Sequence, residues 1–263
     1  MPLEWDAAEY EAVSGPQTDW GADFLGIFLE RWGLRGDETA IDVGCGTGRV
    51  TELLLRHLPG GTVLAVDASE YMVEAARKRF EGDPRVRVEQ RDVLRLEVVE
   101  PVDVIFSTAT FHWIMDHERL FNHLAKLLKP GGRLVAQCGG TDNIARTLAV
   151  AERVMGEDRF KDAFAGWEEG WNFVDPKTTK ARLEAAGFKE VETWLHEEFT
   201  EFASVSELTR FLKTVVLKPH LTFLPEGERH PFARAVAKRL AEEASLVVDY
   251  VRLNMLATRS ETA

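Results

Sequence analysis

A glycine-rich turn follows the first apolar run of the chain. Residues 40–43 are apolar apart from Asp42, and they lead directly into Gly44-Cys45-Gly46-Thr47-Gly48. Glycines allow a sharp turn and let a ligand approach the backbone closely. The N–H groups at the start of the following helix point towards such a ligand. We therefore expect a ligand-binding loop here.

The spacing of the glycines limits what this loop can bind. A dinucleotide site requires Gly-x-Gly-x-x-Gly, and Arg49 occupies the last of those positions. No Gly-Lys-Ser/Thr follows, as a phosphate-binding loop would require. Both observations disfavour a pyrophosphate ligand, so an NAD-linked oxidoreductase is a disfavoured alternative.

Two aspartates follow the next two predicted strands. Asp67 ends the apolar run 62–67, and Asp92 lies just after the alternating run 85–89. Because the carboxyl ends of parallel strands meet at one edge of a sheet, both should lie beside the glycine loop. A carboxylate at Asp67 can accept hydrogen bonds from vicinal ribose hydroxyls, and Asp92 can accept from an adenine amino group. The pattern indicates a nucleoside that carries no phosphate.

A His-Trp pair follows the predicted fourth strand, residues 102–107. Ligands of open α/β sheets bind at the carboxyl ends of strands. His112 and Trp113 are therefore our candidate catalytic residues, lining the pocket of a second substrate. His112 is the first candidate for a general base if a hydroxyl or a carbon is the reacting group. The other six histidines show no metal-ligand spacing, and we expect no metal site.

The first half of the chain alternates between predicted strands and helices. The strands are expected at 40–43, 62–67, 85–89, 102–107 and 133–138. A helix is expected at 21–34, and further helices should begin after Gly48, Ser69 and Asp116, the last two residues acting as N-caps. Strands that alternate with helices imply parallel pairing, with helices on both faces of the sheet.

The second half has a looser pattern. We expect broken helices over 141–173, a helix beginning at Asp175-Pro176, and a strand over 191–196. Helices interrupted by Pro219 and Pro225 should fill 204–245, and alternating residues from Val251 onwards predict a closing strand.

Composition places the chain among globular proteins. It has 263 residues, 45% of them apolar, and a net charge of −12. This acidity disfavours nucleic acid or an anionic membrane as a partner. No apolar run reaches the ~18 residues of a membrane span, no secretory signal is evident, and two cysteines are too few for a disulfide framework. We expect a cytoplasmic protein. The sequence is compatible with a monomer and does not define the oligomeric state.

Taken together, these motifs resemble those of the class I S-adenosylmethionine-dependent methyltransferases. The resemblance covers residues 38–138. It rests on Ile41 to Gly48, Val66-Asp67-Ala68-Ser69-x-x-Met72, Asp92-Val93 and Lys129-Pro130-Gly131-Gly132. It implies a Rossmann-like, doubly wound α/β sheet of seven strands, mostly parallel with the last strand antiparallel, plus a helical cap insertion. It also implies S-adenosylmethionine as cofactor and S-adenosylhomocysteine as its product.

The resemblance further implies roles for single residues. Gly44, Gly46 and Gly48 would hold the methionine portion and the ribose, Asp67 would bind the ribose hydroxyls, and Asp92 the adenine amino group. Further candidates for the cofactor site are Gln17, Asp42, Cys45, Ala68, Met72, Val93 and Ser107. One continuous domain would comprise an N-terminal lid and helix (1–35), a cofactor-binding core (36–140) and the rest of the sheet with helical substrate-cap insertions (141–263).

A smaller set of residues is similar to the trans-aconitate methyltransferase group. These residues are Trp5-Asp6-Ala7 with Tyr10, Ser14, Gln17 and Trp20, then Ser107-x-Ala109-x-Phe111-His112-Trp113, and Gln137-Cys138-Gly139-Gly140. This similarity implies a small-molecule acceptor that is methylated on a carboxylate. Candidate acceptor-site residues are Tyr10, Trp20, Phe111, Trp167 and Arg252.

The nature of the acceptor decides which groups are needed. A carboxylate arrives ionised and needs no base, but it needs an arginine, a lysine or backbone donors to hold it. A lipophilic, phenolic or quinone acceptor is an alternative, supported by the aromatic residues Phe111, Trp113, Trp167, Trp171 and Phe173. A non-catalytic S-adenosylmethionine-binding protein is a second alternative.

Overall fold

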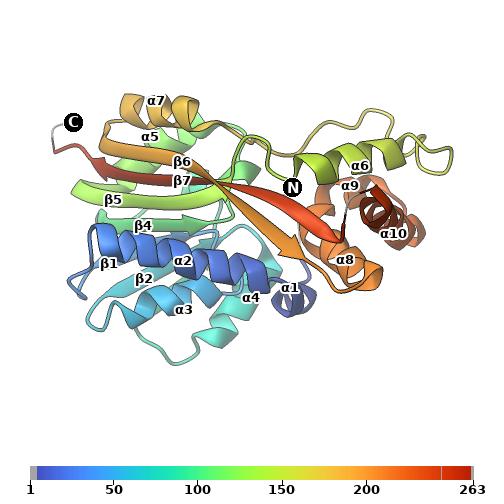
Figure 1. Ribbon diagram of the computed structural model, residues 1–263. Coiled ribbons are helices and arrows are strands. Elements are labelled where there is room, and N and C mark those ends of the chain that lie inside the picture. The colour runs from blue at the N-terminus through green and yellow to red at the C-terminus, as the bar shows by residue number, and fades with distance from the viewer. Residues whose placement is uncertain (1–4, 244, 262–263) are drawn as a thin grey trace.

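A seven-stranded sheet forms the framework of the computed structural model, which describes residues 5–243 and 245–261 (Figure 1). The strand order is β3-β2-β1-β4-β5-β7-β6. The first five strands are parallel to one another, and β7 runs antiparallel to both of its neighbours. The strands are β1 Thr39–Val43, β2 Thr62–Asp67, β3 Val86–Gln90, β4 Val102–Thr108, β5 Leu128–Gly139, β6 Phe188–Glu201 and β7 Val247–Arg259. This topology confirms the predicted fold class.

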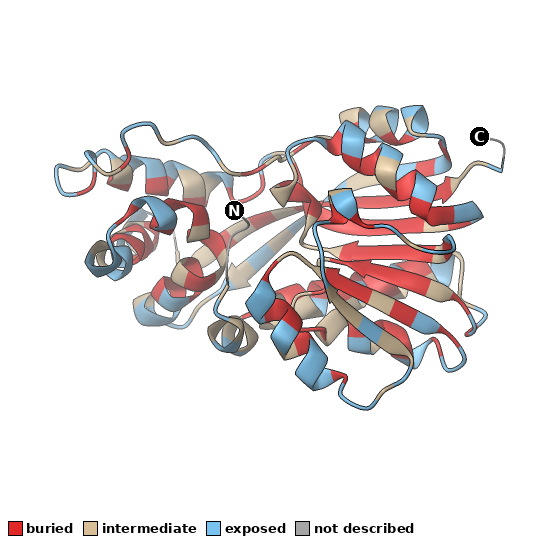
Figure 2. Cartoon of the chain, turned by 180° about the vertical axis from the view of Figure 1, so that it is seen from behind, coloured by how far each residue is buried: buried red, intermediate tan, exposed pale blue. Residues whose placement is uncertain are grey.

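Helices cover both faces of the sheet. The helices α2 (Gly15–Arg31) and α3 (Arg49–Arg56) pack one apolar cluster onto one face, while α5 (His117–Leu127) and α7 (Pro176–Ala185) pack another onto the opposite face. In Figure 1 these two pairs lie below and above the strands. Figure 2 shows the central strands almost entirely buried between the two helical layers. The remaining core helix, α4 (Glu70–Arg79), packs against β2 and β3.

The predicted helix caps explain why these helices begin where they do. The side chains of Ser69, Asp116 and Asp175 accept hydrogen bonds from backbone N–H groups three residues later, at the starts of α4, α5 and α7. Each such bond satisfies one of the N–H groups that a helix leaves unpaired at its first turn. All three caps were expected from the sequence.

The N-terminal segment is more helical than expected. A short helix, α1 (Ala7–Val13), begins at Asp6, whose carboxylate accepts from the N–H of Glu9 at 2.9 Å. Helix α2 begins at Gly15, not at residue 21, and ends at Arg31. The sequence did not predict α1, because Tyr10 faces a cavity and none of the residues of α1 is fully buried, so no apolar helical pattern is visible. The first four residues of the predicted lid lie outside the described part.

A second helical layer projects beyond one edge of the sheet. It comprises α6 (Ala145–Met155), α8 (Val205–Phe211), a π-helical segment (Leu212–Val216), α9 (Lys218–Phe223) and α10 (Glu226–Glu243). These helices enclose their own apolar cluster, which also includes Trp20 and Tyr250. Strands β6 and β7 are longer than expected and reach from the sheet to this layer (Figure 1). Broken helices were expected over 141–173, and α6 confirms the first part of this segment, but residues 157–173 consist of turns and extended chain.

None of the helices in residues 5–243 and 245–261 combines the length and the apolar composition needed to cross a membrane.

Candidate functional site

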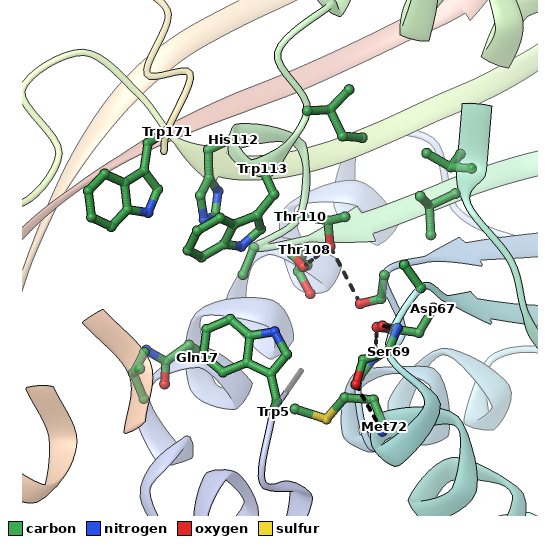
Figure 3. A pocket seen from close by; sticks show the side chains of 18 of the residues that line it. Trp5, Gln17, Asp67, Ser69, Met72, Thr108, Thr110, His112, Trp113 and Trp171 are labelled. Carbon is green, nitrogen blue, oxygen red and sulfur yellow. Dashed lines mark hydrogen bonds between the residues drawn. The ribbon is translucent and has the colours of Figure 1, made fainter. Parts of the chain in front are cut away.

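A cavity of about 820 Å³ lies where the carboxyl ends of the parallel strands meet the N-terminal segment and the outer helical layer. Ligand-binding pockets commonly enclose about 300–1,000 Å³. The strand ends provide the sequence-predicted residues Gly44, Gly46, Asp67, Ala68, Asp92 and Val93 to its wall, and Met72, His112, Trp113, Arg252, Tyr10 and Gln17 join them. The structure therefore brings twelve of the predicted site residues together (Figure 3).

The glycine loop leaves room for a ligand at one position. Gly46 has φ +55° and lines the cavity, and a Cβ atom placed on it would meet nothing within 4 Å. Gly44 is constrained differently, because a Cβ there would lie 1.9 Å from Thr110 Oγ1. A ligand can therefore approach the loop backbone at Gly46, while Gly44 permits close packing of the β4 end.

The carboxylate of Asp67 holds this loop in place. Its Oδ2 accepts from the N–H of Gly46 and its Oδ1 from the N–H of Ser69, both at 2.9 Å. A carboxylate offers about four lone-pair positions and so can accept several hydrogen bonds at once. Asp67 can therefore position the loop and also accept from ligand hydroxyls.

Two buried apolar side chains, Met72 and Val93, line the cavity together with Asp67. The carboxylate of Asp92 also lines it, next to Val93 in the chain. Asp92 Oδ1 accepts from the N–H of Leu94 at 2.9 Å, which fixes the orientation of the carboxylate. These side chains suit a heteroaromatic ring whose edge carries a hydrogen-bond donor.

Helix α1 is tied over the glycine loop by Glu11. The Glu11 carboxylate accepts from Thr47 Oγ1 at 2.5 Å and pairs with Arg79 of α4. Arg49 donates to the Glu11 carbonyl at 3.3 Å. The same segment brings Trp5 and Tyr10 into the cavity wall, with their ring centroids 5.7 Å apart.

His112 is a neutral hydrogen-bond donor in this cavity. Its Nδ1 accepts from the N–H of Gly139 at 3.2 Å, so the ring proton resides on Nε2. Burial, together with the nearby positive charge of Arg252, holds the pKa of His112 well below 6.5. An imidazole in this state presents an N–H group to a ligand and has no free lone pair to serve as a base.

Arg252 is a buried cation that pairs with no carboxylate in the described part of the chain, although the charge of Glu198 acts on it from beyond contact distance. Only 3% of it is exposed, and it lines the cavity. Its Nε donates to Gln137 Oε1 at 3.4 Å, and its guanidinium lies 5.2 Å from the centre of the Trp20 ring. Within the described part of the chain it forms no ion pair. Burial lowers its pKa, but the group stays protonated because arginine starts from 12.5.

Two further buried polar side chains face the same space. Gln17 is 9% and Tyr250 is 5% exposed, and both line the cavity. The Gln17 amide lies near the Tyr250 hydroxyl. However, neither amide atom of Gln17 nor the Tyr250 oxygen has a partner with proper hydrogen-bond geometry in the described structure. Buried polar groups are rarely left without partners, so these atoms indicate a polar ligand.

Known proteins are similar to this chain in sequence. The methyltransferase domain family matches residues 40–132. A trans-aconitate 2-methyltransferase of Methylobacterium nodulans is 33% identical over 193 residues, covering 73% of this chain and 67% of that protein. The chain belongs to the class I methyltransferase family. The cofactor of this family is S-adenosylmethionine.

Other matches to this methyltransferase extend over nearly its whole length. A trans-aconitate 2-methyltransferase of Rhizobium meliloti is 28% identical over 98% of this chain and 100% of its own. Among solved structures, a phosphoethanolamine N-methyltransferase 2 of Haemonchus contortus in complex with S-adenosyl-L-methionine aligns with a TM-score of 0.63 at 18% identity. The alignment covers 97% of this chain and 56% of that one. The latter likeness supports the fold.

Four residues expected at the cofactor lie outside the cavity wall and support the loop instead. Ser107 Oγ donates to the carbonyl of Val43 at 2.8 Å, and Gly48 caps helix α3. Cys45 is buried, and burial raises the pKa of its thiol. Asp42 Oδ2 accepts from Thr51 Oγ1 at 2.5 Å, and burial raises the pKa of this carboxyl to about 7.

Three aromatic residues expected at the acceptor also lie outside the wall. Phe111 is buried beneath the sheet edge against Phe121, and Trp167 stacks on His220 with ring centroids 4.4 Å apart. Trp20 lies behind the wall, against Tyr250 and Arg252. Trp20 therefore supports two residues of the cavity wall and does not itself line the cavity.

Several wall residues were not expected from the sequence. Tyr250 was detectable, because it lies two positions before Arg252 on a strand and so points to the same face. Asn143, Val215 and Val216 carried no signal, since the packing of the outer helical layer brings them to the cavity.

Loss of the Asp67 carboxylate should abolish tight cofactor binding. Asp67→Ala removes the loop anchor and the acceptor for ribose hydroxyls, and we expect its affinity for S-adenosylhomocysteine to fall about 100-fold or more. Calorimetric titration measures this. Asp37→Ala is the control, because Asp37 is an exposed aspartate at the amino end of β1. Equal affinities of the wild type and a folded Asp67→Ala variant would contradict the assignment.

The buried carboxyl of Asp42 should make stability depend on pH. Its pKa is about 7 in the native state, against 3.8 in the unfolded chain. Between these values the native state holds the extra proton. The free energy of unfolding therefore falls by about 1.4 kcal/mol per pH unit as pH rises, until about pH 7.

Asp42→Asn removes this dependence and should keep the hydrogen bond with Thr51. Urea unfolding from pH 5 to 8 should show the variant gaining on the wild type up to pH 7 and no further. Asp103→Asn is the control, because the pKa of Asp103 is lowered and this carboxyl group therefore titrates below the pH range of the experiment. A constant difference between Asp42→Asn and wild type would refute the interpretation.

Proposed function

We propose that the protein is an S-adenosylmethionine-dependent O-methyltransferase that acts on the carboxylate of a small molecule. The observation that carries this proposal is the buried guanidinium of Arg252, which lines the cavity and has no carboxylate partner in the described chain. A buried charge is costly unless it is paired. The acceptor carboxylate supplies that pair.

The cofactor fits the part of the cavity between the glycine loop and helix α4. Gly46 leaves space for the methionine portion beside the backbone, and Asp67 accepts from the ribose hydroxyls. Met72 and Val93 pack on the adenine faces, and Asp92 accepts from the adenine amino group. The loop contains no group that would bind a diphosphate, in agreement with a nucleoside cofactor.

The residues of the chain align the two ligands and exclude water. When bound, the cofactor would supply an electrophilic methyl group to a carboxylate oxygen and would remain as the neutral thioether S-adenosylhomocysteine, so the acceptor would not have to lose a proton. Arg252 holds the ionised carboxylate, and His112 donates from Nε2. The lid residues Trp5 and Tyr10 close the cavity against solvent. Alignment and desolvation are the main means of catalysis available here.

The names of the relatives support a carboxylate acceptor and make trans-aconitate the first compound to test. A lipophilic or phenolic acceptor is the second candidate, favoured by the aromatic rings of the wall. Deprotonation of a phenol would call for a base. His112 is unsuited to that task, because its Nδ1 lone pair is taken by Gly139. If the protein instead binds the cofactor without catalysing methyl transfer, no acceptor will be turned over.

Replacing Arg252 should weaken acceptor binding selectively. We expect Arg252→Met to lower kcat/KM for a carboxylate acceptor about 100-fold, mainly through KM, because the carboxylate loses its buried counter-ion. Affinity for S-adenosylhomocysteine should stay within a few-fold of the wild-type value. Transfer of a labelled methyl group to a panel of carboxylic acids, including trans-aconitate, measures the effect. Arg159→Met, which removes an exposed arginine of the outer layer, is the control. Turnover that is indifferent to Arg252 would defeat the proposal.

The ionisation of His112 should not appear in the pH dependence of kcat. Its pKa lies well below 6.5, so the imidazole stays neutral between pH 6 and 9. We expect no ionisation of His112 to appear in kcat over this range, and an inflection near pH 7 would come from Asp42. His112→Gln, which retains an N–H donor, should reduce kcat by the same factor at every pH. A rate that rises through an ionisation in the wild type and loses it in the variant would instead establish a general base.

A further inference from the structure

A band of aromatic rings lines the cavity and extends from Trp5, beside Met72, to the side that faces away from the cofactor-binding residues (Figure 3). Consecutive ring centroids lie 5.8 Å apart from Trp5 to Trp113, 5.9 Å from Trp113 to Trp171 and 6.0 Å from Trp171 to Phe173. The planes of the last pair are inclined by only 15°. Figure 3 shows Trp171, His112 and Trp113 on one side of the opening, across from Asp67, Ser69 and Met72. These rings form an apolar wall that is nearly flat at its Trp171–Phe173 end, whereas the planes of Trp5 and Trp113 are inclined by 70° and those of Trp113 and Trp171 by 42°.

Aliphatic side chains extend this wall. Ile114 and Ile144 line the cavity, as do Val215 and Val216 from the π-helical segment. Such segments interrupt helices at functional sites more often than elsewhere. The surface available to an acceptor is therefore mainly apolar, apart from the polar group formed by Arg252, His112, Gln17 and Tyr250.

Positive charge is scarce among the residues that line this side, although the Lys218 ammonium lies 5.9 Å from the centre of the Trp5 ring. Of the cavity-lining residues in the described ranges, Arg252 is the one buried cation. Arg91 and Arg95 also touch the cavity, but both are exposed and flank Asp92 at the adenine end. One carboxylate can thus be paired on the acceptor side. A second or third would lose its hydration against indole rings without a counter-ion, which is unfavourable.

From this distribution we infer that the preferred acceptor is a monocarboxylic acid with a flat apolar body, such as an aryl- or alkenyl-carboxylate, and that Trp113 and Trp171 determine this preference. The inference rests on the proposed function and narrows its substrate class. The inferred preference distinguishes this protein from relatives named for trans-aconitate, which is a tricarboxylate.

The test compares trans-cinnamate and trans-aconitate as methyl acceptors. Cinnamyl alcohol serves as the control, because it has the same apolar body as trans-cinnamate but no carboxylate. We expect kcat/KM for trans-cinnamate to exceed that for trans-aconitate at least tenfold. Calorimetry of each acid against the enzyme saturated with S-adenosylhomocysteine gives a readout that does not depend on turnover, and it should show the same order. Cinnamyl alcohol should be neither bound tightly nor methylated.

Variants of the wall identify the determinant. Trp171→Ala should lower affinity for trans-cinnamate about tenfold and leave S-adenosylhomocysteine binding unchanged. Trp171→Arg adds a second cation and should shift the preference towards trans-aconitate. Trp32→Ala is the matched control, because Trp32 lies against Arg133 near the opposite edge of the sheet. These variants keep the test informative if one of them fails to fold.

The outcomes separate the inference from the proposed function. Preference for trans-aconitate, with no effect of Trp171→Ala, overturns the inference and leaves the carboxylate methyltransferase intact. Methylation of cinnamyl alcohol as fast as trans-cinnamate, or the absence of any binding or turnover of either acid by enzyme that binds S-adenosylhomocysteine, overturns both. The expected order of acids, reversed by Trp171→Arg, supports both.

Discussion

The site depends on the position of one carboxylate. Asp67 ends β2 and holds the N–H groups of Gly46 and Ser69, so it joins the glycine loop, the sheet and the start of α4. The loop itself is bonded to the same strand, since the N–H groups of Gly44 and Cys45 both donate to the carbonyl of Val66. Parallel pairing then brings the ends of β1, β2 and β4 to one edge. Everything else in the cavity is placed relative to this rigid junction.

The opposite wall is held by a different network that begins on the antiparallel strand. Gln137 of β5 accepts from Arg252 and donates from its Nε2 to Asn254 at 2.8 Å, which fixes which end of the amide faces the guanidinium. Arg252 and Asn254 are two positions apart on β7 and so share a face. The long reach of β7 beyond the sheet thus delivers a cation to the cavity and anchors the outer helices that enclose it. The strands thus fix the position of the cavity's buried cation, whereas the helices and turns determine the shape of the cavity.

The sequence was informative where local rules determine the structure. Strand β2, the caps of α4, α5 and α7, and the convergence of Gly46, Asp67 and Asp92 all follow from nearest-neighbour patterns and parallel topology. It was uninformative where distant segments meet. The roles of Ser107 and Trp20 were missed because a hydroxyl or an indole beside a motif may face the ligand or the layer behind it, and only packing decides. The tautomer of His112 was equally hidden, since it is set by the N–H of Gly139 on another strand.

The attachment of α1 to the glycine loop affects the order of events in a catalytic cycle. The Glu11 carboxylate accepts a hydrogen bond from Thr47 of the glycine loop and pairs with Arg79 of α4, while Trp5 and Tyr10 on the same segment line the cavity. If this segment has to move to admit the cofactor, the same movement will take Trp5 and Tyr10 out of the cavity wall. The binding of the two ligands would then be coupled. Such coupling favours an ordered kinetic mechanism in which the cofactor binds first, the acceptor follows, and the methylated product departs before the spent nucleoside.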